Sequence, residues 1–233
     1  MKLIWLAADY HFPSSYSIRI PNLSTASAKT MPAPGPATVR LALISASIEF
    51  GGLDFAKSDV FPLVRYPEIY VRPPERVSIT SQIIWNHKWS TSKGKVLINK
   101  APVCREFALA HGLMTVYICV PKSKKKVFCS LLRMIGYWGQ SSSLAYCMGV
   151  EEREPISGQY GLPLAKVSPD KLIQEYFSCY ATEFKSPEIT WEDIVPPKPE
   201  RRPISPLSME LYIWPMKICE KQGANMHLAR CPL

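Results

Sequence analysis

A short run in the middle of the sequence alternates aromatic rings with hydrogen-bonding and cationic groups. Residues 85–89 read Trp-Asn-His-Lys-Trp, and more cations follow. The bases of a single strand stack on such rings while cations follow its phosphates, and stacking contributes about 1 to 3 kcal/mol per base. The run predicts contact with RNA. The alternative is a hairpin whose tryptophans pack on the protein's own body. The residues predicted to contact RNA here are Trp85, His87, Lys88, Trp89, Lys93, Lys95, Lys100 and Arg105.

The positive charge of the chain is concentrated around this run. The 233 residues contain 28 Lys and Arg against 19 Asp and Glu, a net charge of +9. Residues 57–133 hold 14 of the basic residues and 4 of the acidic ones, so the rest of the chain is close to neutral. A cationic centre of this kind favours a polyanion such as nucleic acid. An anionic membrane surface or a solvated basic surface remain alternatives.

Two further basic groups stand next to predicted helix starts. Arg19 and Lys29 lie in a loop before a helix whose first turn carries Arg40, and a helix start presents free amides to an anion. Lys124 and Lys126 precede a second helix. We expect all five to contact RNA phosphates. Ordinary capping and a solvated turn are the alternatives.

The residue types of catalytic and metal sites are scattered. The four histidines are far apart, and the seven cysteines show no C-x-x-C spacing, which predicts reduced thiols in a cytoplasmic protein. No P-loop, dinucleotide fingerprint, G-x-S-x-G or H-E-x-x-H motif occurs. The longest uncharged run, residues 134–150, contains Gly, Gln and Ser. The sequence therefore predicts no catalytic residue, metal, cofactor or membrane span.

The elements that position these residues follow a strand-helix-strand, insertion, strand-helix-strand order. Apolar alternation, glycine stops and proline-rich breaks set their limits. We expect strands over residues 2–8, 63–71, 112–121 and 143–150, helices over 37–50 and 127–135, and a hairpin from 77–85 and 95–98. The strand at 112–121 is apolar at nearly every position, which predicts a central strand covered on both faces.

The segment after residue 151 has a different composition, with acidic residues and frequent Pro and Gly. A Ser-Pro-Asp cap predicts a short helix over 171–180. Residues 187–206 are proline-rich and are not expected to be helical. We expect a last strand over 207–216 and a loosely held tail after Gly223.

Taken together, four stretches resemble the CRISPR-associated protein 5 family of the RAMP superfamily: residues 15–21, 34–42, 104–120 and 126–139. The resemblance implies an α+β fold with a ferredoxin-like, RRM-related core over residues 1–150. It also implies a basic hairpin thumb inserted at 72–104, and an irregular proline-rich extension over 151–233 that packs on the core. Pro34-Gly35-Pro36 stands where the family has a glycine-rich loop.

The resemblance further implies a non-catalytic, RNA-binding subunit of a type I CRISPR Cascade effector that grips the 5′ handle of crRNA. Its partners would be crRNA, the backbone RAMP subunits, the large subunit and, through the complex, target DNA. Arg19, Lys29 and Arg40 would hold handle phosphates, and residues 85–100 would form the thumb. One alternative is a metal-independent endoribonuclease that processes precursor crRNA, for which His87 beside Lys88 is the pair to test. Another alternative is a DNA-binding accessory module.

Overall fold

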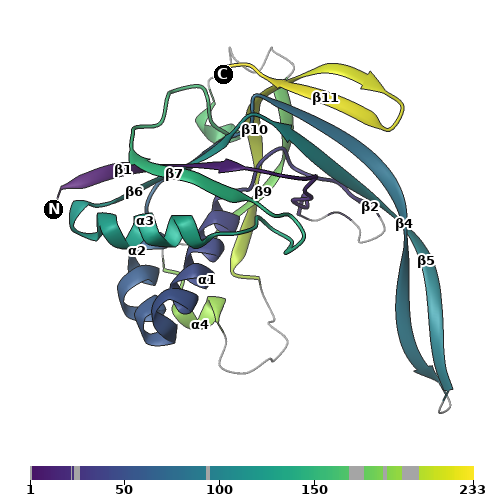
Figure 1. Cartoon of the computed structure of the whole chain (residues 1–233), viewed down its shortest axis with the longest axis horizontal. Helices are drawn as coiled ribbons and strands as arrows, with labels where there is room; N and C mark the ends of the chain where they lie inside the picture. Colours follow the sequence, from purple (N-terminus) through teal and green to yellow (C-terminus); the bar gives the residue numbers. More distant parts are fainter. Residues whose placement is uncertain are drawn as a thin grey trace.

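The fold is α+β, as the sequence predicts. The computed structural model describes residues 2–21, 23, 27–92, 95–167, 176–185, 188–195 and 205–233. These residues form two mostly antiparallel sheets, and the main helices gather beside the first sheet (Figure 1). No helix in this described part is both long and apolar enough to cross a membrane.

The first sheet has four strands in the order β3-β6-β1-β7, and every neighbouring pair is antiparallel. Along the chain, a helix joins its first strand to its second and another joins its third to its fourth. The predicted element order is thereby confirmed. The elements are β1 (Leu3–His11), α1 (Pro36–Phe55), β3 (Ile69–Arg72), β6 (Met114–Pro121), α3 (Lys125–Met134) and β7 (Tyr146–Glu152), with a 3-10 turn at Lys122–Lys124 before α3.

Strand β6 is central and covered on both faces, as its apolar sequence predicts. Val116, Tyr117 and Ile118 are fully buried, although successive side chains of a strand point to opposite faces. One face packs under the helices, where the Tyr10 hydroxyl donates a hydrogen bond of 2.6 Å to the Leu132 carbonyl. This apolar layer is the core of the molecule.

Helix α1 breaks where the two glycines predict a stop. Gly52 has φ 83° and ψ −179°, a conformation essentially restricted to glycine. Helical turns resume beyond it as a π-helical turn, Ala56–Val60, and as α2 (Phe61–Val64). The strand predicted over 63–71 is therefore wrong at its start. Pro62 sits in the first turn of α2, where a missing N–H costs little, so the chain stays helical to Val64 and the short strand β3 begins only at Ile69.

The second sheet has seven strands and draws on both halves of the chain. Its order is β2-β5-β4-β11-β10-β8, and β9 also pairs with β10. Strands from both sides of residue 150 share this sheet. The division into a core and an extension at that residue stays a prediction. The strands are β2 (Ser27–Ala28), β4 (Arg76–Ser92), β5 (Lys95–His111), β8 (Leu162–Pro163), β9 (Tyr176–Phe184), β10 (Leu207–Gln222) and β11 (Asn225–Arg230).

Three expectations for the C-terminal third are wrong. Residues 176–180 of the predicted helix belong to strand β9, whose aromatic residues favour a sheet, while residues 168–175 lie outside the described part. The tail after Gly223 forms β11, which pairs with β4 and buries Leu228. In the described part of the proline-rich segment, α4 (Trp191–Ile194) forms a helical turn that begins with a Thr190–Asp193 capping box. A 3-10 turn, Leu164–Lys166, follows β8.

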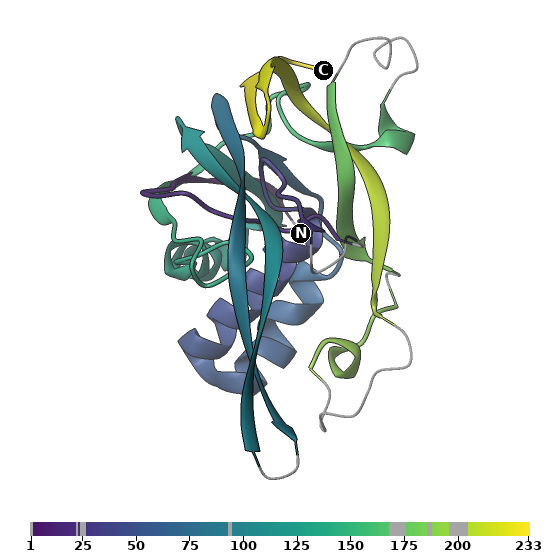
Figure 2. The same cartoon turned by 90° about the vertical axis from the view of Figure 1, so that its right-hand side faces the viewer.

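The predicted hairpin is confirmed and is longer than expected. Strands β4 and β5 pair from Arg76 opposite His111 to Ser92 opposite Lys95. Strand β11 pairs only with residues 76–80, and β2 reaches only residues 104–105. Residues 82–92 and 95–104, called the ribbon below, therefore extend away from the body of the protein as a two-stranded arm (Figures 1 and 2).

Candidate nucleic-acid interface

One face of the ribbon presents aromatic, apolar and cationic groups together. Trp85 lies opposite Pro102 and His87 lies opposite Lys100, and residues directly opposite or two apart share a face of a strand pair. The Trp85 side chain is 60% exposed, so the indole is not packed into the body of the protein. We call the following exposed set the ribbon face: Ile83, Trp85, His87, Ile98, Lys100 and Pro102.

The other predicted residues of this segment fall on or beside the ribbon. Lys88 and Trp89 lie opposite Asn99 and Ile98, and Lys95 begins β5; only the backbone of these three is described. Lys93 lies outside the described residues. Arg105 is half-buried at the base, opposite Gln82 and thus on the other face from Trp85.

Arg19 and Lys29 are exposed near the base of the ribbon. Arg19 forms a β-bridge with Thr30, and its guanidinium donates to the Leu23 carbonyl. The neighbouring strand β2 pairs with Cys104 and Arg105 of β5. The structure therefore brings this loop and the ribbon together, although they are far apart in the sequence.

Arg40 is a correction to the predicted site. Its side chain is only 7% exposed, its Nε lies 2.8 Å from Glu183 Oε1, and another guanidinium nitrogen donates to the Val64 carbonyl. Each of the three guanidinium nitrogens thus donates within the protein, and the buried group is not accessible to a phosphate. Arg40 therefore ties α1 to β9, and we remove it from the candidate interface.

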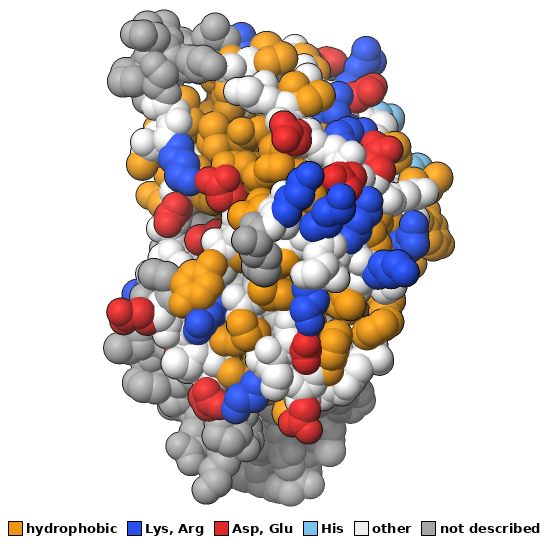
Figure 3. Space-filling model, turned by 90° about the vertical axis from the view of Figure 1, so that its left-hand side faces the viewer, with side chains coloured by type: hydrophobic (Ala, Val, Ile, Leu, Met, Phe, Trp, Pro, Cys, Tyr) orange, Lys and Arg blue, Asp and Glu red, His pale blue; other side chains and the backbone are white. Residues whose placement is uncertain are grey.

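The lysines of the 3-10 turn and of the first turn of α3 lie at the end of the molecule that Figure 3 shows, where Asp and Glu side chains stand among Lys and Arg. Lys124 is 2.8 Å from Asp59, and Lys125 is 2.8 Å from Glu152. The ion pair with Lys125 also lowers the pKa of Glu152. Lys126 is exposed. These pairs offset much of the local charge, so this turn is a weaker candidate than the ribbon.

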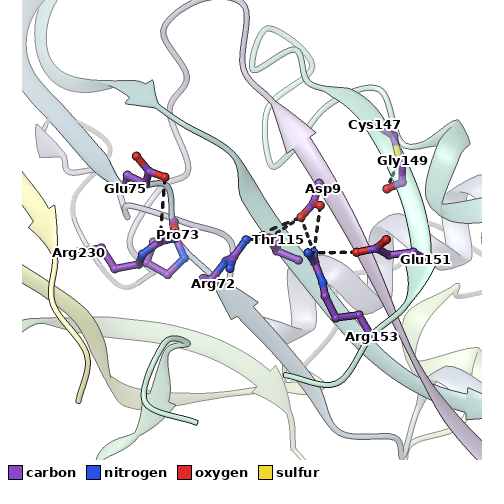
Figure 4. A network of polar contacts seen from close by, with 10 residues as sticks. All are labelled: Asp9, Arg72, Pro73, Glu75, Thr115, Cys147, Gly149, Glu151, Arg153 and Arg230. Atoms are coloured by element: carbon purple, nitrogen blue, oxygen red, sulfur yellow. Dashed lines mark hydrogen bonds and ion pairs between the residues drawn. The ribbon is translucent and has the colours of Figure 1, made fainter. Parts of the chain in front are cut away.

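The face of the first sheet away from the helices is filled by a polar network (Figure 4). Arg153 donates to both oxygens of Asp9, at 2.9 and 3.0 Å, and the Thr115 hydroxyl donates to Asp9 at 2.6 Å. Arg72 donates to the same hydroxyl at 2.8 Å. Thr115 and Tyr117 are fully buried, so the part of this face around Asp9 is covered and offers no platform on which bases could stack.

A cavity of about 390 Å³ opens beside the base of the ribbon. It joins the loop before α1, the roots of β4 and β5, strand β9 and the β10–β11 turn, so no single stretch of sequence predicts it. Burial raises the pKa of its Cys179 thiol to about 12, so the thiol stays protonated at neutral pH. Its wall also holds Lys29, Ser81, Glu106, Tyr180, Lys221 and Asn225.

The structure does not gather the four histidines. His87 faces Lys100 on the ribbon, whereas His227 Nδ1 lies 2.9 Å from the Ser78 hydroxyl on the outer face of the second sheet. His111 lines the same surface hollow as His227. Within the described residues, no group of three or more His, Cys, Asp and Glu side chains is arranged to hold a metal ion.

Comparison with known proteins finds a related sequence. The chain is 26% identical over 194 residues to the CRISPR-associated protein Cas5 of Archaeoglobus fulgidus, and the match covers 82% of this chain and 84% of the relative. A crystal structure of a CRISPR protein from Archaeoglobus fulgidus has a similar fold, with a TM-score of 0.52 at 14% identity, over 97% of this chain and 92% of that one. The chain is therefore similar in sequence to a CRISPR-associated protein Cas5 and similar in fold to a CRISPR protein.

Two other comparisons add nothing to these similarities. A chain of a CRISPR RNA-guided surveillance complex aligns with 99% of this chain and 91% of its own length, at 10% identity and a TM-score of 0.42. At that score the likeness carries no argument. No family model matches the chain. The likeness to Cas5 thus rests on the related sequence, and the likeness in fold rests on the crystal structure.

Proposed function

We propose that this protein is the RNA-binding subunit of a type I CRISPR effector complex and that it holds the 5′ handle of the guide RNA without cleaving it. The observation that carries the proposal is the ribbon face, where an exposed indole stands beside a cation on an arm projecting from the body. Stacking on a ring and charge pairing with phosphates are two of the interactions by which proteins bind single-stranded RNA.

The proposal assigns a role to each part of the fold. The first sheet with α1 and α3 is the ferredoxin-like core, and the ribbon is a thumb that lies against RNA and a neighbouring backbone subunit. Arg19 and Lys29 hold phosphates of the same strand where it passes the base of the ribbon. Lys124 and Lys126 lie at the end of the molecule away from the ribbon, where another stretch of RNA would pass. The large subunit and, through the complex, target DNA are the further partners.

The proposed place of action is the cytoplasm. Support comes from the cysteines, because each of the seven, all within the described residues, is a free thiol. Free thiols are usual in a reducing compartment.

Salt dependence of assembly tests the proposal. Lys88, Lys93 and Lys95 are replaced together by Ala in the full chain, which is expressed with guide RNA and its partner subunits. RNA-dependent assembly should weaken, and the slope of log affinity against log salt should fall by up to about 2, since each lost contact to a single strand removes about 0.7. Ala at the exposed residues Lys57, Lys166 and Lys185 is the matched control for lost charge. Assembly that matches the control across the salt series would overturn the proposal.

Cleavage is tested separately. Purified protein is mixed with repeat RNA in the presence of a chelator, and we expect the RNA to remain intact. A discrete cut at the handle boundary, abolished by His87→Ala, would establish the endoribonuclease alternative instead. Equal affinity for duplex DNA and single-stranded RNA would favour the DNA-binding module.

A further inference from the structure

We propose that the cavity at the base of the ribbon is a pocket for one guanine base of the bound RNA, with Glu106 as the group that selects it. The inference rests on the proposed function and adds to it a base preference. The volume of the cavity, about 390 Å³, falls within the range of about 300 to 1,000 Å³ that is usual for small-ligand pockets.

The cavity lies in line with the ribbon face. Ser81 and Glu106, which line it, are directly opposite each other on β4 and β5. Ile83, Trp85 and His87 follow Ser81 at steps of two residues, so they lie on the same face of the strand pair. From Ser81 to Trp85 the strand advances about 13 Å. An RNA strand stacked on Trp85 therefore reaches the cavity within a short distance.

The charges of the cavity are arranged for a base inside and phosphates outside. Lys29 and Lys221 are exposed, whereas Glu106 is half-buried. Glu106 Oε2 accepts the Thr30 N–H at 3.0 Å, which fixes the carboxylate in place. Among the described residues no ion pair to Glu106 is formed, so its negative charge repels a phosphate.

The acceptor character of Glu106 determines which base fits. An ionised carboxylate only accepts hydrogen bonds and can accept several. Guanine presents two adjacent donors on its Watson–Crick edge, N1–H and the 2-amino group, and both can meet one carboxylate. In adenine and cytosine the amino group adjoins a ring nitrogen that is an acceptor, and in uracil the N3–H lies between two carbonyls. The aromatic ring of Tyr180, also in the wall, offers a surface for the face of the base.

The test measures base preference with the full chain and short labelled RNAs. Uridine tracts carry one guanosine, inosine, adenosine or cytidine, and affinity is read by fluorescence anisotropy. We expect guanosine to bind about ten-fold or more tightly than adenosine or cytidine, in line with a bidentate contact, and inosine, which lacks the 2-amino group, to lie between them.

The variant Glu106→Gln should abolish the preference while keeping binding of the plain uridine tract, because an amide oxygen can still accept the Thr30 N–H. Glu49→Gln is the control, since it removes an exposed carboxylate from α1. Equal binding of all tracts by the unaltered protein, or an unchanged preference in Glu106→Gln, would overturn the guanine pocket and leave the proposed RNA-binding function standing. Failure to bind any of the RNAs would overturn both.

Discussion

Replacing Trp85 by Ala removes the largest exposed ring of the ribbon face, and its effects on folding and on RNA binding should differ. The side chain is 60% exposed, so about 40% of it is covered. That is on the order of 100 Å² for an indole, which at about 25 cal/mol per Å² limits the lost free energy of unfolding to about 2.5 kcal/mol. A fully buried tryptophan would cost about 3 to 5 kcal/mol.

Trp85→Ala should lower RNA affinity much more than the removal of an exposed ring on the other sheet. One stacked base contributes about 1 to 3 kcal/mol, so Trp85→Ala should weaken binding about 5- to 150-fold. Trp85→Phe keeps a ring and should recover most of the affinity. Affinity is measured by fluorescence anisotropy with single-stranded RNA, and the free energy of unfolding by urea titration.

The matched control is Tyr146→Ala, because Tyr146 on β7 is 58% exposed and lies on the other sheet. It should leave RNA affinity unchanged. A fall of less than two-fold in Trp85→Ala, or an equal fall in the control, would refute the assignment of the ribbon face to RNA.

Three further predictions concern the fold and the cavity. Arg40→Ala should lower the free energy of unfolding by about 3 to 5 kcal/mol in a urea titration, because it leaves Glu183 partly buried and unpaired; a change below 1 kcal/mol would contradict the structural role of this pair. Gly52→Ala should cost about 1 to 3 kcal/mol although the new Cβ meets no atom, since φ there is 83°; unchanged thermal unfolding would speak against this conformation. Native Cys219, which is exposed, should react with iodoacetamide well before Cys179, whose pKa burial raises to about 12; equal labelling rates by mass spectrometry would show that the cavity wall is open.

The parts of the fold that could be predicted are those in which the local sequence pattern favours the same structure as the tertiary contacts. Strand β6 is apolar at nearly every position because both of its faces are covered, and α1 breaks at Gly52 because few other residues adopt that conformation. The hairpin could be predicted because β4 and β5 are close in sequence and pair with each other.

The parts that could not be predicted depend on contacts between distant residues. Strand β9 follows a helix-like cap in the sequence, but its pairing with β10 determines its conformation. Arg40 stands at a helix start, which is typical of a phosphate ligand, but it pairs with Glu183, which is distant in the sequence. Glu106 shows no signal of its own, because the cavity around it is assembled from several separate segments. Ile83 and Ile98 were also missed, although alternation along the hairpin places them on the face of Trp85.

Site-specific photo-cross-linking tests the central claim most directly. A benzophenone amino acid is placed at position 85 of the ribbon or, for comparison, at position 146 of β7, and each full-length protein is assembled with guide RNA and illuminated. The ribbon should cross-link to the RNA in the position-85 protein, with little or no product from position 146. RNA that remains bound in the assembly but cross-links no better from position 85 than from position 146 would contradict the account.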